Sequence, residues 1–399
     1  MVVNVITGLM NYVFNVLVGR LLGPEGYAEI AATFSYMVIL SIPVGIVITL
    51  LIQKIGEAEK PLEYSASIYE WLREICRTYW FLFLIPMIFI PFMPWVTNVT
   101  PFAAYIIIPI VMPSAATAFY DGVYQGLHLF WRYSISNIMS TILRLMGAAL
   151  LYVRKELAIV LGFISLATIF RFIFFHVLLN KKYKELGKNI IPKKITFSKL
   201  LKDKQLWYTS ILTATLGLIN NVDIIAVKKL FDAEQAGYYS AWAQYAKIIL
   251  YLLAPLVSIL YIFFSNNKQR IYHQIVFITS FLVLIAIGVA TNLGYGFYGK
   301  KLIFMLFGKE FYPINTYLEW AAYYGTGYVM MMVMSFYFLA RKSIISLVPA
   351  LLLPLYVVAL IVYPNNIADV MYLNIIYVFL SITIFLLAFF KDRVIFLLK

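Results

Sequence analysis

Four polar residues lie in a stretch of the chain that is otherwise apolar enough to cross a bilayer. Asn220, Asn221 and Asp223 belong to one apolar run, and Lys247 belongs to the next. The short segment KKLFDAEQAG joins the two runs. It places Asp223 and Lys247 about six and ten residues, or roughly 9 and 15 Å, from the same membrane face. Polar side chains are costly at such depth, so we expect each to have a partner, a ligand or water.

Two arginines occupy comparable positions in the first half of the chain. Arg144 and Arg171 lie about eleven and nine residues from the cytoplasmic ends of their predicted helices, near mid-membrane. A guanidinium at this depth must face protein, water or an anion, and its planar fork suits bidentate contacts with phosphate. With Lys247, these two arginines are therefore candidates to line a cationic cavity.

Each of these charges also has an alternative interpretation as a permanently paired group. Lys247 would pair with Asp223, Arg144 would meet Asp121 or a serine, and Arg171 would cap backbone carbonyls or extend to the membrane surface. Asp223 is alternatively a candidate to bind a coupling proton or Na⁺, because a desolvated carboxylate favours its protonated form. The sequence leaves these alternatives open.

Intramembrane amides form a second group of candidates. Their side chains suit hydrogen bonds to the hydroxyl groups of a sugar, although bonds between helices are their commoner use in membrane spans. The group comprises Asn11, Asn15, Asn220 and Asn221.

Composition decides the class of protein. Of the 399 residues, 63% are hydrophobic and 13% are charged, and the mean hydropathy is +0.87. Soluble domains carry about 25% charged residues. Apolar runs recur along the whole chain without the alternation of barrel strands, so we predict an all-α integral membrane protein. The net charge of +14 is expected of cytoplasmic loops, and we expect no nucleic-acid partner.

The apolar runs predict about twelve transmembrane helices, each close to the ~20 residues that a bilayer requires. The first run lacks a basic n-region, so we expect it to be a span and not a cleaved signal peptide. The predicted spans are residues 2–21, 28–53, 79–97, 101–126, 133–152, 157–180, 207–228, 237–264, 271–297, 315–340, 343–363 and 368–390.

Loop charges set the predicted orientation. With both termini in the cytoplasm, 21 Lys and Arg residues lie inside and eight outside. The positive-inside rule favours this arrangement, and we expect a multi-pass protein of the plasma membrane. Two connections are long and strongly charged, Gln53 to Tyr79 and the basic segment 181–206. We interpret the second as a lipid-attracting linker between a lobe of residues 1–180 and a lobe of residues 207–399.

The two predicted lobes begin alike. RLLGPE at residues 20–25 is followed by Gly26 and Tyr27, and KLFDAE at residues 229–234 is followed two residues later by Gly237 and Tyr238. Because each lobe holds an even number of spans, this similarity predicts parallel repeats related by an axis along the membrane normal.

These segments resemble the oligosaccharide flippases, or polysaccharide biosynthesis proteins, of the multidrug/oligosaccharidyl-lipid/polysaccharide exporter superfamily. The matching pieces are weak singly but cover most of the chain in order. They are GRLLGPEGY at 19–27, YQGL at 124–127 with SNI at 136–138 and LR at 143–144, Asp223 with AGYY at 236–239, and LFGKEF at 306–311.

The resemblance implies a MATE-like, V-shaped transporter of two six-helix bundles that works by alternating access. Its implied substrate is an oligosaccharide linked to a polyprenyl phosphate or pyrophosphate, moved from the cytoplasmic to the outer leaflet. The cationic cavity would bind the phosphates of this lipid, and polysaccharide assembly proteins would be partners. Relatives often carry extra residues before the first helix, whereas the first predicted helix here begins at residue 2 of the sequence.

Three other functions compete with this hypothesis. An ion-coupled drug or small-molecule antiporter of the same superfamily would favour an acidic cavity, whereas Arg144, Arg171 and Lys247 outnumber Asp223. A membrane glycosyltransferase, polymerase or ligase would need a sizeable outer catalytic loop, and the longest one here, about Gly299 to Pro313, is short and basic. A non-transporting assembly protein is the third.

We expect neither an enzyme nor a bound cofactor or metal. The sequence has no Gly-rich nucleotide-binding loop and no paired catalytic carboxylates. It has a single cysteine, Cys76, and its three histidines are scattered along the chain.

Overall fold

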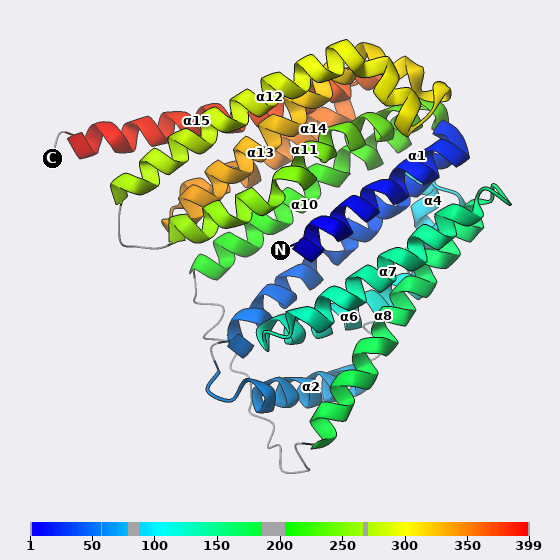
Figure 1. The fold of residues 1–399 in the computed structure, drawn as a ribbon, viewed down its shortest axis with the longest axis vertical. Helices are drawn as coiled ribbons and strands as arrows, with labels where there is room; N and C mark the ends of the chain where they lie inside the picture. Colours follow the sequence, from blue (N-terminus) through cyan, green and yellow to red (C-terminus); the bar gives the residue numbers. More distant parts are fainter. Residues whose placement is uncertain are drawn as a thin grey trace. The chain divides into compact units, whose positions relative to one another are not determined.

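The computed structural model describes residues 2–56, 58–78, 88, 90–185, 204–265 and 270–397. Within these ranges the chain is helical throughout and has no strand (Figure 1). The predicted all-α fold is thus confirmed. The helices are α1 (Val2–Gly56), α2 (Pro61–Thr78), α4 (Met93–Thr97), α5 (Pro101–Ile106), α6 (Ile108–Gly126), α7 (Phe130–Leu150), α8 (Leu157–Glu185), α10 (Lys204–Leu230), α11 (Ala233–Ser265), α12 (Arg270–Leu306), α13 (Leu318–Ala340), α14 (Val348–Val362) and α15 (Ile367–Leu397), with 3₁₀ segments η2 (Ile90–Phe92), η3 (Lys309–Tyr317) and η4 (Ile344–Leu347).

Six helical segments of the described ranges are long and apolar enough to cross a membrane, or seven if Pro101–Val111 and Ala116–Gly126, bent by 42°, form one span. These six are Ile6–Gly56, Leu157–Tyr183, Lys204–Leu230, His273–Leu306, Ile344–Val362 and Ile367–Lys391. Most of the predicted span 79–97 and of the linker 181–206 falls outside the described residues. The number of twelve spans therefore stays a prediction.

The helices form two compact units. One contains residues 15–31 and 207–399, and the other contains residues 2–14 and 32–206. The middle of α1 thus belongs with the C-terminal residues. The predicted lobes, residues 1–180 and 207–399, did not assign the middle of α1 to the C-terminal residues.

A sharp turn at Gly23 explains how α1 contains two predicted spans. Gly23 has φ 71° and ψ −177°, a backbone conformation that residues with a Cβ rarely adopt. Pro24 then begins the second half of α1, where a fixed φ favours a first helical turn. The related break between α10 and α11 falls at Phe231 and Asp232, as the predicted repeat requires.

In the first unit, the α1 turn packs closely against the C-terminal helices. Glu29 and Lys228 form an ion pair at 3.1 Å, with only 6% and 7% of their side chains exposed. Tyr27 is fully buried and contacts the rings of Phe307 and Phe311 at centroid distances of 5.6 and 6.3 Å. An apolar core and a buried ion pair thus hold this turn in place.

The centre of the same unit is α13, which packs against α11, α12 and α15 (Figure 1). Most of its side chains are buried. Gly325 of α13 lets the backbones of α13 and α11 approach each other closely, because a Cβ there would lie 2.4 Å from the Ala246 carbonyl oxygen of α11. This contact brings the polar residues of α11 against α13.

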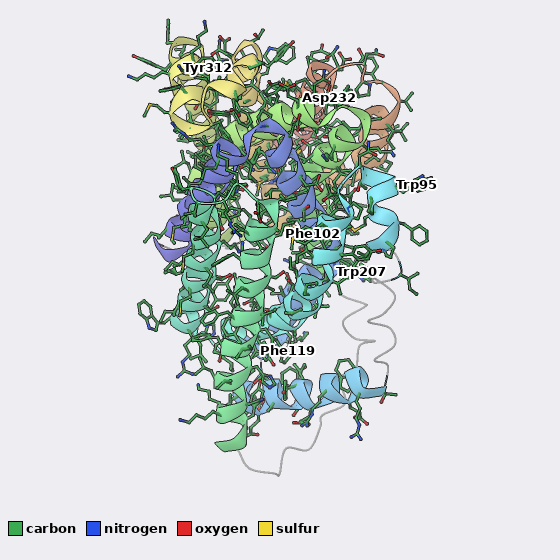
Figure 2. The ribbon with its side chains drawn as sticks, turned by 90° about the vertical axis from the view of Figure 1, so that its right-hand side faces the viewer. Trp95, Phe102, Phe119, Trp207, Asp232 and Tyr312 are labelled. Carbon is green, nitrogen blue, oxygen red and sulfur yellow. The ribbon has the colours of Figure 1, made fainter. Side chains whose placement is uncertain are left out.

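In the second unit, α2 lies across the ends of α6 and α8 (Figure 1). Its small residues Ser65 and Ala66 are buried, and the Tyr183 hydroxyl donates a hydrogen bond to Ser65 Oγ at 3.1 Å. The rings of Tyr69 of α2 and Phe119 of α6 are tilted against each other with their centroids 6.0 Å apart, and Figure 2 shows Phe119 next to α2. From its charges this segment was predicted to be a charged connection, and the packed helix is a feature that the sequence did not predict.

The α1 turn also yields a stability prediction. Gly237 is buried, and a Cβ there would lie 2.0 Å from the Pro24 carbonyl oxygen. We expect Gly237→Ala to destabilise the protein by about 1–3 kcal/mol through overpacking. The control is Gly294→Ala in α12, where a Cβ meets nothing within 4 Å and helix propensity favours alanine by about 1 kcal/mol. Equal unfolding temperatures for both variants in detergent would contradict this contact.

Candidate functional site

Asp223 lies at the centre of a buried hydrogen-bond network contributed by four helices. Its Oδ2 accepts hydrogen bonds from the Tyr239 hydroxyl at 2.5 Å and from Asn374 Nδ2 at 3.2 Å. Asn374 Nδ2 also donates to the Tyr239 oxygen at 2.6 Å, and the Tyr356 hydroxyl donates to Asn374 Oδ1 at 2.5 Å. Asp223 is 1% exposed. The network therefore fixes one carboxylate oxygen firmly.

The second oxygen of this carboxylate has no such support. Asp223 Oδ1 is buried and has no hydrogen-bond partner among the described residues. An unsatisfied buried carboxylate oxygen is costly. The same oxygen is therefore available to a proton or to a small cation.

Lys247 lies near Asp223 but does not pair with it directly. The two groups attract each other electrostatically, yet the ion pairs of the described residues do not include this one. Instead Lys247 lines a cavity of about 10 Å³ with Asn220, Tyr324 and Tyr328, room for about one water molecule. The direct Asp223–Lys247 pair that the sequence suggested as an alternative is absent from this structure.

The two neighbouring amides of α10 differ in role. Asn220 shares the small cavity with Lys247. Asn221 is buried, and its Nδ2 donates to the Gly217 carbonyl of the same helix at 2.8 Å. Only Asn220 is thus brought together with Lys247. Asn11 lies in the other unit, half-buried on α1.

The second unit contains its own buried charges, around Arg171 of α8. Arg171 Nη2 donates to Asp121 Oδ1 of α6 at 2.6 Å, and Arg171 Nε donates to Ser136 Oγ of α7 at 3.1 Å. The side chains of Arg171 and Asp121 are 16% and 12% exposed. Arg171 also lies over the Phe175 ring at 5.5 Å. This guanidinium is fixed by partners on three helices.

Arg144 of α7 is much less well supported than Arg171. Its one hydrogen bond within the described chain is a long one, from Nη2 to Ser140 Oγ at 3.5 Å, and its Nε is buried without a partner. The two guanidinium groups are close enough to repel each other. Asp121 is thus bonded to Arg171. The contact between Arg144 and Asp121 that one alternative suggested is not formed, and Arg144 bonds a serine instead. Arg171 takes the carboxylate, and Arg144 is left with the long bond to Ser140.

Sequence reasoning missed several residues of both sites. Asn374 is an amide inside an apolar run, and the criterion applied to Asn220 would have found it. Tyr239 and Tyr356 gave no such signal, because tyrosines are abundant in this chain. No group of three or more His, Cys, Asp or Glu within the described ranges could hold a metal ion.

The Arg171–Asp121 pair gives a prediction for stability. We expect Asp121→Asn to cost about 3–5 kcal/mol, because it leaves a buried guanidinium unpaired. Adding Arg171→Gln to this variant is expected to recover much of the loss in a double-mutant cycle. The control is Glu63→Gln, which breaks an exposed pair with Lys60 and is expected to cost at most about 1 kcal/mol. Similar unfolding energies for Asp121→Asn and Glu63→Gln would be inconsistent with the geometry.

The fold is shared with solved membrane transporters. A structure described as the lipid II flippase MurJ in an inward closed conformation has a TM-score of 0.67 at 13% identity, covering 97% of this chain and 86% of that one. An inward-facing multidrug resistance MATE family transporter of the MOP superfamily gives 0.65 at 13%, covering 97% and 94%. Its outward-facing counterpart gives 0.60 at 11%, covering 98% and 94%. These likenesses establish a MATE-like fold.

The sequence itself identifies the family. A comparison with curated proteins finds no match. Residues 1–268, about two thirds of the chain, match the family described as "Polysaccharide biosynthesis protein". The predicted resemblance is therefore confirmed: the chain belongs to the polysaccharide biosynthesis protein family and shares its fold with the MATE and MurJ transporters above.

Proposed function

We propose that this protein is a flippase for a lipid-linked oligosaccharide. It moves a sugar attached to a polyprenyl phosphate or pyrophosphate from the cytoplasmic to the outer leaflet by alternating access, for the assembly of a surface polysaccharide or glycan. The observation that carries the proposal is Arg144, a buried and poorly satisfied guanidinium beside Arg171. It is a transporter and not an enzyme, in a plasma membrane with both termini in the cytoplasm.

The charge balance around Arg144 favours an anionic substrate. If the intramembrane arginines had only a structural role, each would be expected to have a carboxylate partner, because an unpaired buried charge is strongly unfavourable. Asp121 supplies one negative charge for two guanidinium groups. A phosphate would satisfy the remaining donors with charge-assisted hydrogen bonds.

Lys247 is the candidate cation of the other unit, where Asp223 attracts it without forming an ion pair. It has no ion pair within the described ranges, and Asn220, Tyr324 and Tyr328 line the adjoining cavity with it. In the proposed function, Lys247 contacts the phosphates, and Asn11, Asn220 and Asn221 are candidates to hydrogen-bond sugar hydroxyls. Asn221 is the weakest of these, because its amide already bonds within its own helix.

Asp223 is proposed as the site of ion coupling. A proton or Na⁺ at Asp223 Oδ1 would satisfy the one buried oxygen that the network leaves without a partner. The same observation favours the second candidate function, an ion-coupled antiporter of small molecules. The two functions differ in their substrate: the antiporter would take a cation, whereas Arg144 and Lys247 favour an anion.

A transport assay tests the role of the cations. We expect Arg144→Ala, Arg171→Ala and Lys247→Ala each to lower the translocation of a lipid-linked oligosaccharide in proteoliposomes by about 10- to 100-fold, the value of one charge-assisted hydrogen bond. Arg144→Lys is expected to restore only part of the rate, because lysine cannot make bidentate contacts. The control is Lys60→Ala, in the exposed pair with Glu63.

Each variant is compared at equal amounts of folded protein. Wild-type rates in Arg144→Ala and Lys247→Ala would exclude the cationic mechanism. A wild-type protein that is inactive on every lipid-linked sugar but exchanges a cationic drug for protons would favour the antiporter.

A second assay tests ion coupling. Asp223→Asn keeps acceptor capacity towards Tyr239 and Asn374 but removes the charge. We expect its transport rate to lose the response to an imposed Na⁺ or pH gradient. Tyr239→Phe removes two hydrogen bonds of the same network, to Asp223 and from Asn374, and is expected to cost about 1–3 kcal/mol of stability while keeping the response. A gradient response in Asp223→Asn equal to that of wild type would rule out this site.

A further inference from the structure

A groove on the outside of the second unit runs between α7 and α8, beside the turn that joins them. Its volume is about 490 Å³. Its walls are almost entirely apolar, and Arg154 is the one charged residue that lines it. The apolar walls include Leu150, Val153, Ile159, Phe163 and Leu166.

Two glycines of the neighbouring helices shape this groove. Gly162 of α8 lines it, and a Cβ at Gly162 would meet no atom within 4 Å. The missing side chain therefore leaves open space and not a packed contact. Gly147 of α7 lies directly against the opposite helix, since its Cβ would lie 2.5 Å from Phe163 Cβ. The close approach at Gly147 fixes the Phe163 wall.

Exposed apolar side chains flank the groove. Leu150 and Leu166 are 42% and 49% exposed, as expected of side chains that meet lipid. Arg154 is exposed in the turn between the two helices, and the sequence predicts that this turn lies at a membrane face. Of the adjacent charges, Lys155 and Glu156 offset each other, so the turn presents one net positive charge at the mouth of the groove.

We propose that this groove holds one acyl chain of an anionic phospholipid, whose headgroup pairs with Arg154. An apolar channel with a single cation at its mouth complements an apolar chain with a single negative headgroup. The proposed occupant is a phospholipid because the lining is apolar apart from the one cation, Arg154. This site is separate from Arg144, Arg171 and Lys247 and does not depend on the proposed substrate.

Native mass spectrometry of the delipidated full-length protein, titrated with phosphatidylglycerol or phosphatidylcholine, tests the proposal. We expect wild type to retain one phosphatidylglycerol at concentrations about tenfold lower than phosphatidylcholine, the effect of one charge-assisted contact. Arg154→Gln is expected to abolish this preference. Gly162→Leu, which fills the groove without a clash, is expected to abolish retention of the tightly bound lipid.

The matched control is Gly294→Leu in α12, where a Cβ likewise meets nothing within 4 Å. It is expected to bind lipid as wild type does, and unfolding temperatures show that each variant is folded. Undiminished phosphatidylglycerol retention in Gly162→Leu would overturn the proposal. So would displacement of the bound lipid by an equal concentration of a polyprenyl phosphate, which would assign the groove to the carrier lipid.

Discussion

The cost of placing a charge in hydrocarbon governs the interior of both units. Glu29 and Lys228 meet this cost by direct pairing in a nearly dry site. Arg171 meets it with one carboxylate, one hydroxyl and a ring face. One oxygen of Asp223 is stabilised by hydrogen bonds from a tyrosine and an amide, and its other oxygen has no partner among the described residues. Arg144 is the charge that a static structural role does not explain, whereas Lys247 is attracted to Asp223 without a direct ion pair.

The contrast between Arg144 and Arg171 is the clearest example of this difference. Both lie at similar depth and in adjacent helices, and both have a serine within reach. Asp121 is bonded to Arg171 and leaves Arg144 with a buried, unpartnered Nε. A phosphate at Arg144 would resolve an imbalance that folding leaves in place. The fold alone does not choose this substrate, because it resembles both a lipid II flippase and multidrug transporters.

The sequence predicted the helical membrane fold, the family and the polar residues inside the spans. Hydropathy and composition decide these features locally. It did not predict the partners, because depth along a helix does not define which way a side chain points. Asp223 and Lys247 were placed at similar depth, yet the carboxylate bonds Tyr239 and Asn374. The packed helix α2 was missed because its many charged residues resemble those of a loop, although its apolar residues recur at helical spacing.

The central claim is that Arg144 binds the phosphate of a lipid-linked sugar. Solid-state NMR measures it directly, through the dipolar coupling between the substrate phosphorus and the labelled guanidinium nitrogens of the reconstituted protein. Spectra of wild type and Arg144→Lys identify the arginine. The account predicts a coupling in wild type that corresponds to hydrogen-bond contact, with N–O distances of about 2.7–2.9 Å, and its loss in Arg144→Lys. A bound substrate whose phosphorus shows no coupling to Arg144 would contradict it.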